Sequence, residues 1–110
     1  MKLEKVDPPH QFSPDYTFYC QGCHSDHGIW ITKRNRKGAI WIFDGNLDKP
    51  TISPSINCGC DDPQVNYRCH FFIKAGMIEF LSDCTHSLAG QTVEMEEIII
   101  WNQIRKKFGL

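Results

Sequence analysis

Residues 68–81 read RCHFFIKAGMIEFL, and this stretch decides the fold class that we predict for the chain. Two runs rich in aromatic and β-branched residues flank a turn at residues 74–76, a pattern typical of a β-hairpin. Successive side chains of a strand point to opposite faces of a sheet. Cys69 and His70 are therefore predicted to face opposite sides, and we do not expect them to bind one ion together.

Further strand signals lie on both sides of this hairpin. The stretches 16–19 and 28–32 are predicted to pair around a cysteine turn, and a polar turn at 33–38 followed by an apolar run at 39–43 predicts another hairpin. Two prolines make residues 51–53 an extended edge or irregular segment. Most of the chain is thus expected to be β-structure.

The remaining segments are assigned from prolines, turn residues and helical periodicity. Prolines make residues 1–14 an extended N-terminal segment, and residues 57–66 have the composition of a surface loop. Apolar residues recur with a period near 3.6 over residues 94–108, where acidic side chains precede basic ones, so this stretch is predicted to be a helix packed on the core. The folded domain is expected to span residues 15–110.

Length and charge exclude several classes of protein. A chain of 110 residues is expected to form one domain, and its net charge of -1, from 12 basic and 13 acidic side chains, gives no general attraction to nucleic acid or to an anionic membrane. The sequence has no run of 18 apolar residues and no apolar segment after its first lysines, so neither membrane insertion nor secretion is expected. We predict a cytoplasmic protein; its oligomeric state is left open.

The cysteines predict a metal site rather than disulfides. A Cys-x2-Cys turn points two thiolates at one place, a second pair can complete a tetrahedron around zinc, and a reducing compartment keeps the thiols free. The predicted ligands are Cys20, Cys23, Cys69 and Cys84. Such a closed site would give a structural zinc. Either of two histidines can replace one thiolate, and a pair of loop cysteines can replace the second pair; these alternatives are His27, His86, Cys58 and Cys60.

Another group of residues supplies the parts of a nucleophilic hydrolase. A serine needs a base within hydrogen-bond reach, and the base needs a third group that fixes its tautomer. Ser55, His70 and Asp83 can fill these roles in that order. A Ser-Pro turn and a histidine on a strand also occur for purely structural reasons, and this alternative stays open.

Three short motifs together resemble a known family. They are Trp41-x-Phe43-x-Gly45, Pro50-Thr51-x-x-Pro54-Ser55 and Asp83-Cys84-x-His86. The resemblance covers roughly residues 18–94 and is to a domain of unknown function that is common in phages and bacteria. Members are often mislabelled as ammonia monooxygenase, a label that nothing in this chain supports.

The resemblance implies an activity. Relatives of the wider family lie beside bacterial ubiquitin-like conjugation genes and are considered peptidases for the ubiquitin-like protein. For this chain it implies a serine-type peptidase or related acyl hydrolase acting on a protein or peptide, with Ser55 and His70 at its centre and Asp83 or His86 assisting. The fold expected with it is a small zinc-stabilised β domain of hairpins closed by one C-terminal helix.

Two other classes of function stay open. The first is a zinc-stabilised phage or bacterial binding module that inhibits or recruits a host factor through the helix or the basic turn at 33–37. The second is a metal-dependent hydrolase, which requires an open zinc site with His70 or His86 as a ligand.

Overall fold

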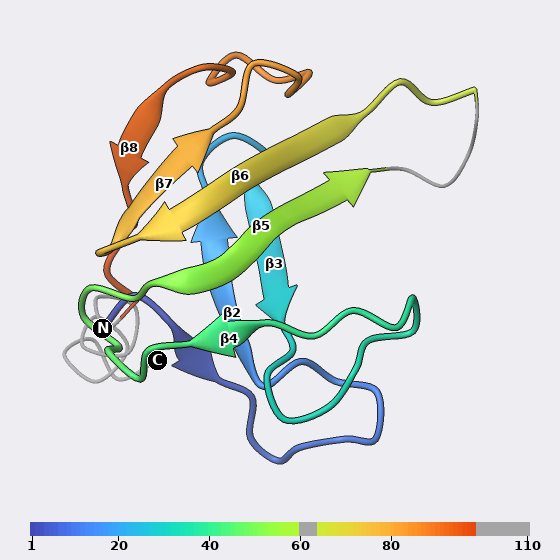
Figure 1. The fold of residues 1–110 in the computed structure, drawn as a ribbon, viewed down its shortest axis with the longest axis vertical. Helices are drawn as coiled ribbons and strands as arrows, with labels where there is room; N and C mark the ends of the chain where they lie inside the picture. The colour runs from blue at the N-terminus through green and yellow to red at the C-terminus, as the bar shows by residue number, and fades with distance from the viewer. Residues whose placement is uncertain (60–63, 99–110) are drawn as a thin grey trace, which may run out of the picture.

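Two antiparallel sheets make up the computed structural model, which describes residues 1–59 and 64–98 (Figure 1). The smaller sheet has the order β1-β2-β3, with β1 (Glu4–Lys5), β2 (Tyr16–Cys20) and β3 (Ser25–Ile29). The larger sheet has the order β4-β5-β6-β7-β8, with β4 (Ile42–Phe43), β5 (Ile52–Gly59), β6 (Arg68–Lys74), β7 (Met77–Phe80) and β8 (Thr92–Glu94). The prediction of a mainly β domain is confirmed.

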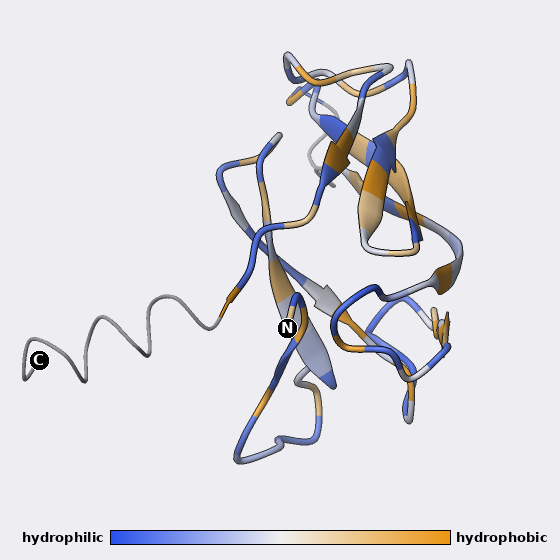
Figure 2. Cartoon of the chain, turned by 90° about the vertical axis from the view of Figure 1, so that its left-hand side faces the viewer, coloured by the Kyte–Doolittle hydropathy of each residue, from blue (hydrophilic) through white to orange (hydrophobic). Residues whose placement is uncertain are grey.

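The hairpin of residues 68–81 forms as its sequence pattern predicts. β6 and β7 pair from Phe71 opposite Phe80 to Lys74 opposite Met77. The turn between them contains Gly76 at a φ of 78°, a left-handed conformation that glycine adopts at little cost. Along β6, buried side chains alternate with half-buried ones, and Figure 2 shows the corresponding apolar and polar bands on the strands.

The core lies between the two sheets. The rings of Phe18 on β2 and Phe71 on β6 meet edge to face, with their centroids 5.8 Å apart. The buried apolar side chains of the core are Leu3, Phe18, Cys20, Ile29, Ile52, Ile56, Cys69, Phe71, Ile73, Ile78, Phe80, Cys84 and Met95. Each large side chain buried in this way stabilises the fold by about 1.5–3 kcal/mol. The cysteines thus lie within the same core that joins the sheets.

The pairing of the middle segments differs from the sequence-based expectation. Residues 42–43 pair with β5 rather than with the stretch at 28–32. The neighbouring Trp41 N–H does donate to the Trp30 carbonyl (2.8 Å), which connects the two segments. β5 also runs on through Gly59, into the stretch predicted to be loop. Pro54 is tolerated within β5 because the β5–β6 ladder shifts register between Ile52 and Ile56, where a missing N–H removes no regular bond.

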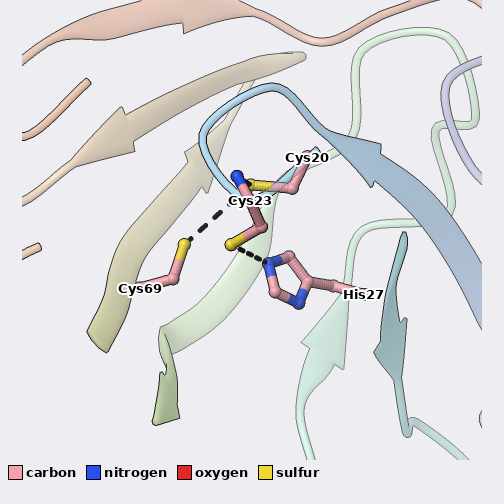
Figure 3. Close-up of side chains that lie close together, drawn as sticks. All are labelled: Cys20, Cys23, His27 and Cys69. Atoms are coloured by element: carbon pink, nitrogen blue, oxygen red, sulfur yellow. Dashed lines mark hydrogen bonds between the residues drawn. The ribbon is translucent and has the colours of Figure 1, made fainter. Parts of the chain in front are cut away.

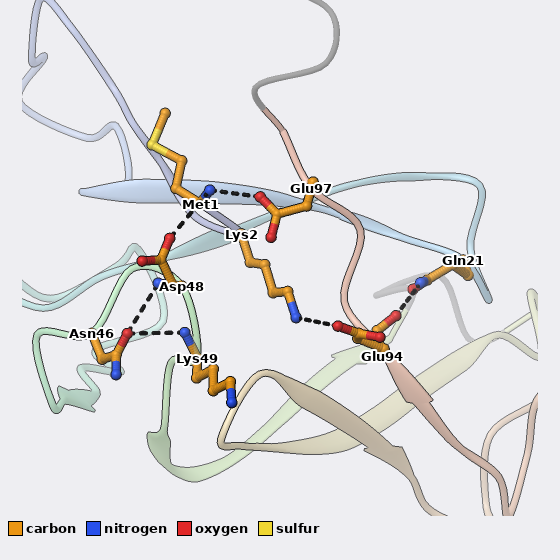
Figure 4. Close-up of polar contacts among 8 residues, drawn as sticks. All are labelled: Met1, Lys2, Gln21, Asn46, Asp48, Lys49, Glu94 and Glu97. Atoms are coloured by element: carbon orange, nitrogen blue, oxygen red, sulfur yellow. Dashed lines mark hydrogen bonds and ion pairs between the residues drawn. The ribbon is translucent and has the colours of Figure 1, made fainter.

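The N-terminal segment carries β1 and contributes to the core, since Leu3 is fully buried. Beside it the Lys2 ammonium lies 2.8 Å from a Glu94 carboxylate oxygen (Figure 4). The Lys2 N–H donates to the Leu47 carbonyl. Glu94, the expected first residue of the helix at 94–108, instead ends β8. Residues 95–98 are described and are not helical, and residues 99–108 of that prediction lie outside the described residues. No helix within the described ranges has the length and apolarity needed to cross a bilayer.

The Asp15 carboxylate holds the start of the segment that leads from β3 to β4 through hydrogen bonds. It accepts hydrogen bonds from the N–H groups of Ile31 (2.6 Å) and Thr32 (2.9 Å) and from the Thr32 hydroxyl (2.6 Å). Burial raises the pKa of this carboxyl, but the bonds from Thr32 and Ile31 outweigh it, so the pKa is lowered from 3.8. The ionised form is therefore favoured in the folded state.

We expect Asp15→Asn to lower the free energy of unfolding by roughly 1–3 kcal/mol at pH 7, because bonds to a charged acceptor are replaced by weaker ones. A lowered folded-state pKa means that the stabilisation is present above the unfolded pKa of 3.8 and is lost as the pH falls through the folded value. Urea unfolding at a series of pH values should show the gap between wild type and variant closing below about pH 4. A gap that stays constant would contradict this explanation.

Candidate active site and metal centre

The pairing of β5 with β6 brings Ser55 to His70. Asn57 lies opposite His70, so Ser55, two residues earlier on the strand, shares its face. Between the pairs Ile52–Ile73 and Ile56–Phe71, β5 advances four residues while β6 advances two. Ser55 lies in this irregular stretch, and bulges of this kind redirect side chains. The Ser55 hydroxyl oxygen lies 3.1 Å from His70 Nε2.

The other ring nitrogen of His70 meets a carboxylate. His70 Nδ1 lies 3.1 Å from Asp83 Oδ2, and the side chains of His70 and Asp83 are 23% and 48% exposed. Ser55, His70 and Asp83 thus form a continuous chain of hydrogen bonds. A carboxylate that accepts from Nδ1 keeps the proton there, which leaves Nε2 free to accept the serine proton.

Asp83 is held in place by the segment that follows β7. The Leu81 N–H donates to the His70 carbonyl (2.9 Å), and Cys84 Sγ both accepts from the His70 N–H (3.2 Å) and donates to the His70 carbonyl (3.1 Å). The Thr85 N–H in turn donates to the Arg68 carbonyl (2.9 Å). Residues 81–85 are therefore fastened along β6, which fixes the carboxylate beside the imidazole.

A groove with a volume of about 400 Å³ opens beside Ser55. One wall is the stretch of β5 from Pro54 to Asn57, and the other is the segment 34–41. The Trp41 indole N–H bridges the walls by donating to the Ser55 carbonyl at 3.3 Å. Ser55, the first residue of the hydrogen-bonded chain, is therefore one of the residues that line an open groove.

A sulfur-rich cluster lies on the opposite face of β6. The ligand atoms of Cys20, Cys23, His27 and Cys69 all lie within 4.8 Å of one another (Figure 3). Cys20 and Cys23 come from the turn between β2 and β3, where the Cys23 N–H donates to Cys20 Sγ (3.4 Å), and Cys69 comes from the other sheet. The cluster therefore joins the two sheets.

These donors fit a tetrahedral zinc ion. In a tetrahedral site, zinc–sulfur distances of about 2.3 Å and zinc–nitrogen distances of about 2.0 Å imply about 3.8 Å between two sulfurs and about 3.5 Å between a sulfur and a nitrogen. Cys20 Sγ and Cys69 Sγ are 3.9 Å apart, and Cys23 Sγ and His27 Nε2 are 3.3 Å apart. Soft thiolates with one imidazole favour zinc over calcium or magnesium. The cluster can hold a metal ion of this kind.

The pKa values of the cluster show strong coupling between its thiols. The bond to Cys69 lowers the pKa of the Cys20 thiol to about 3, while the same bond raises the pKa of Cys69. Burial lowers the pKa of His27, but the neighbouring Cys20 and Cys58 sulfurs outweigh it and raise that pKa to about 11. These directions describe a Cys20 thiolate beside a protonated His27 imidazole, and a zinc ion that bound here would displace the protons of its ligands.

The structure separates the predicted metal ligands into two overlapping groups. Cys20, Cys23 and Cys69 come together with His27, whereas Cys84 lies within 4.8 Å of Cys69 and His86 in a second group. His86 Nε2 is 3.3 Å from Cys69 Sγ and therefore lies with the cysteines rather than with Asp83 at the His70 ring. The remaining alternatives are Cys58, which pairs with Cys69 across the β5–β6 ladder, and Cys60, which lies outside the described residues.

His70 is separated from both groups by the alternation along β6, as its parity predicts. Its two ring nitrogens face Ser55 and Asp83, so this arrangement gives no support to a role as a zinc ligand in a metal-dependent hydrolase. Sequence reasoning missed Tyr67, whose hydroxyl donates to Cys23 Sγ at 2.5 Å, and the groove residue Asn57. The sequence did hold a signal for Asn57, because residues two apart on a strand share a face and Asn57 follows Ser55 by two. The assignment of residues 57–66 to a loop hid this signal.

Comparison with known proteins identifies one family. A sequence model of the BubE family, described as bacterial ubiquitination-like system serine protease, matches residues 6–81, which is more than half of the chain. Searches of curated proteins and of solved structures gave no match. The matched range contains Ser55, His70 and the four residues of the first cysteine and histidine cluster, while Asp83 lies just beyond it.

Proposed function

The chain belongs to the BubE family, and we propose that it is a serine peptidase in which Ser55 is the nucleophile, His70 the general base and Asp83 the residue that orients the base. The observation that carries this proposal is the chain of two 3.1 Å contacts from the Ser55 hydroxyl through the His70 ring to the Asp83 carboxylate. The family description supports a protein of a ubiquitin-like system as the substrate.

The geometry supports an acyl-transfer mechanism. Ser55 Oγ attacks the substrate carbonyl as His70 Nε2 takes the hydroxyl proton, and the carbonyl electrons move to its oxygen. When the tetrahedral intermediate collapses, His70 returns the proton to the leaving nitrogen or oxygen and an acyl-enzyme ester remains on Ser55. His70 then takes a proton from the water that attacks this ester and gives it to Ser55 Oγ as the ester bond breaks, which releases the acid and restores Ser55.

Backbone donors near Ser55 are proposed to stabilise the negative oxygen of the intermediate. Donors that are already oriented lower the barrier without reorganising during the reaction. The Trp41 indole supports this arrangement because its bond to the Ser55 carbonyl fixes the local backbone of β5.

A structural zinc in the first cluster is part of the proposal. Its ligands would be Cys20, Cys23, His27 and Cys69, a closed set of four that supplies cross-linking between the sheets rather than a site for water. The chain's own residues carry the chemistry, because the imidazole of His70 faces away from the cluster.

A fluorophosphonate reagent tests the proposed nucleophile directly. An activated serine oxygen forms a bond to phosphorus as fluoride leaves and the base takes the proton, so the intact mass of the protein rises by one phosphonyl group. Peptide mapping should place that group on Ser55, and labelling should be much slower after His70→Ala. Labelling at another serine, or at none, would overturn the proposal.

Asp83→Asn is expected to lower kcat by about 10²- to 10³-fold with little change in KM, because an amide can donate to Nδ1 and favour the wrong tautomer of the base. The loss should be smaller than for a fully buried aspartate, since this side chain is 48% exposed and water can partly replace it. Steady-state kinetics on a cleavable peptide, with the exposed neighbour Ser82→Ala as the control, measures the effect. An unchanged kcat would remove Asp83 from the mechanism.

A further inference from the structure

The groove beside Ser55 runs along an exposed edge of β5. β4 pairs with β5 only at Ser53 and Ile52, so within the described part of the chain no strand covers the outer side of β5 beyond Pro54. An open strand edge of this kind can pair with an added peptide strand. Ser55 lies on this part of β5, so a peptide strand added at the edge would lie beside the proposed nucleophile.

The backbone of Asn57 faces this groove. Both backbone groups of His70 are occupied on the β7 side, where the carbonyl accepts from Leu81 N–H and the N–H donates to Cys84 Sγ. The backbone groups of His70 therefore point away from β5. In an antiparallel ladder the two residues of such a non-hydrogen-bonded pair both direct their N–H and carbonyl groups away from each other's strand. Asn57, opposite His70, therefore directs its N–H and carbonyl toward the groove, on the side where Ser55 directs its carbonyl to Trp41.

The facing wall is ordered before any substrate arrives. The Asn35 N–H donates to the Ala39 carbonyl (2.8 Å), and its side-chain oxygen accepts from the Ala39 N–H (2.8 Å). Arg34 closes the same turn, with its guanidinium donating to the Gly38 carbonyl at 2.9 Å. A wall fixed by its own bonds loses little entropy when a ligand binds against it.

The charged side chains that line the groove are all basic. Arg34 and Lys37 line it, together with the aromatic Trp41 and the exposed Ile40, and no acidic side chain is among its described lining residues. The chain as a whole has a net charge of -1, so this cationic wall is a local feature. A carboxylate is the complementary partner of a guanidinium, and a forked contact between them fixes orientation as well as adding energy.

We propose that the substrate binds as an extended peptide that pairs with the β5 edge at Asn57 and places an acidic side chain, Asp or Glu within about three residues of the scissile bond, against Arg34. This inference rests on the proposed peptidase function and adds to it a class of substrate. Backbone pairing supplies affinity that does not depend on sequence, and the arginine supplies the preference.

A proteome-derived peptide library, digested with the whole protein and read by mass spectrometry of the new ends, tests the inference. Wild type should cut at sites enriched in Asp and Glu near the scissile bond. Arg34→Glu should lose that enrichment, favour sites with Lys or Arg, and lower kcat/KM for acidic peptides about 10-fold. Arg36→Glu is the matched control, because Arg36 lies in the same turn but against the Phe12 ring and not in the groove.

The outcomes separate this inference from the proposed function. Cleavage without acidic enrichment, or with the same site preference in Arg34→Glu as in wild type, would overturn the inference and leave the peptidase intact. Fluorophosphonate labelling of Ser55 without cleavage of any peptide would also overturn it. Absence of both labelling and cleavage would overturn the peptidase function and the inference together. If Arg34→Glu does not fold, Arg34→Gln, whose amide can still donate to the Gly38 carbonyl, should lose the enrichment without reversing it.

Discussion

Ser55→Ala is expected to lower peptide hydrolysis by at least about 10⁴-fold, because the attacking oxygen is lost and only binding and oxyanion stabilisation remain. The hydroxyl is half-buried, and its described contact is with His70 Nε2, so its removal leaves the two sheets and the cysteine cluster unchanged. The melting temperature and metal content should therefore match those of wild type. Cleavage of a peptide pool and intact-mass detection of the phosphonylated protein measure the two expected losses.

Ser53→Ala is the matched control for this variant. Ser53 is exposed, lies two residues earlier on β5 and pairs with Ile42, but the hydrogen-bonded chain to Asp83 does not include it. Its replacement should leave kcat/KM within about 2-fold of wild type, as expected for a surface change away from the site. A Ser55→Ala protein that remains folded and active would instead favour the alternative of a binding module.

The parts of the fold that depend on local sequence were predictable. The β6–β7 hairpin formed as expected because its alternation and its glycine turn act within 14 residues of chain, and the same alternation separated Cys69 from His70. The β4–β5 pairing was not predictable in the same way. The local signals favoured a hairpin with the preceding strand for residues 39–43 and an irregular edge for residues 51–53. Strand propensity does not determine which distant segments pair.

The candidate site shows the same division. The types of residue were visible in the sequence, but the contact between Ser55 and His70 depends on the register shift in β5, for which the sequence holds only the weak signal of Pro54. The place of His27 in the first cluster depends on β3 beginning at Ser25, which turns the imidazole toward Cys23. Sequence spacing left both His27 and His86 as alternatives, and it could not rank them.

β6 connects the metal cluster to the proposed catalytic chain. Cys69 faces the cluster on one side of the strand, and His70 faces Ser55 on the other, so the two sites are adjacent along the backbone but do not share a side chain. The ladder of β5 and β6 carries both Ser55 and His70, and the cluster joins it to the smaller sheet beside the ring contact of Phe18 and Phe71. Loss of the metal should therefore affect activity through the fold and not through the reaction.

Removal of the proposed zinc with a chelator is expected to lower the melting temperature by roughly 15 °C or more. A structural zinc would contribute folding free energy directly, and each 1 kcal/mol shifts the melting temperature by several degrees in a domain of this size. Activity and folded fraction should fall together. A chelated protein that stays folded but loses activity would instead indicate an open, catalytic metal.

The metal content of two cysteine variants distinguishes the two possible ligand groups. Cys23→Ser removes a candidate ligand of the first group, and we expect it to lose the proposed zinc and to melt at a temperature close to that of the chelated protein. Cys84→Ser removes a candidate ligand of the second group, together with the sulfur that contacts the His70 backbone, and we expect it to retain zinc while kcat falls.

The alternative ligand set consists of four thiolates, Cys20, Cys23, Cys69 and Cys84, and it predicts zinc loss in both variants. Zinc retained by Cys84→Ser would therefore favour His27 as the fourth ligand. Zinc lost from Cys84→Ser but retained by Cys23→Ser would assign the metal to Cys69, Cys84 and His86, and the stabilising link would then lie within the larger sheet and its following segment rather than between the two sheets.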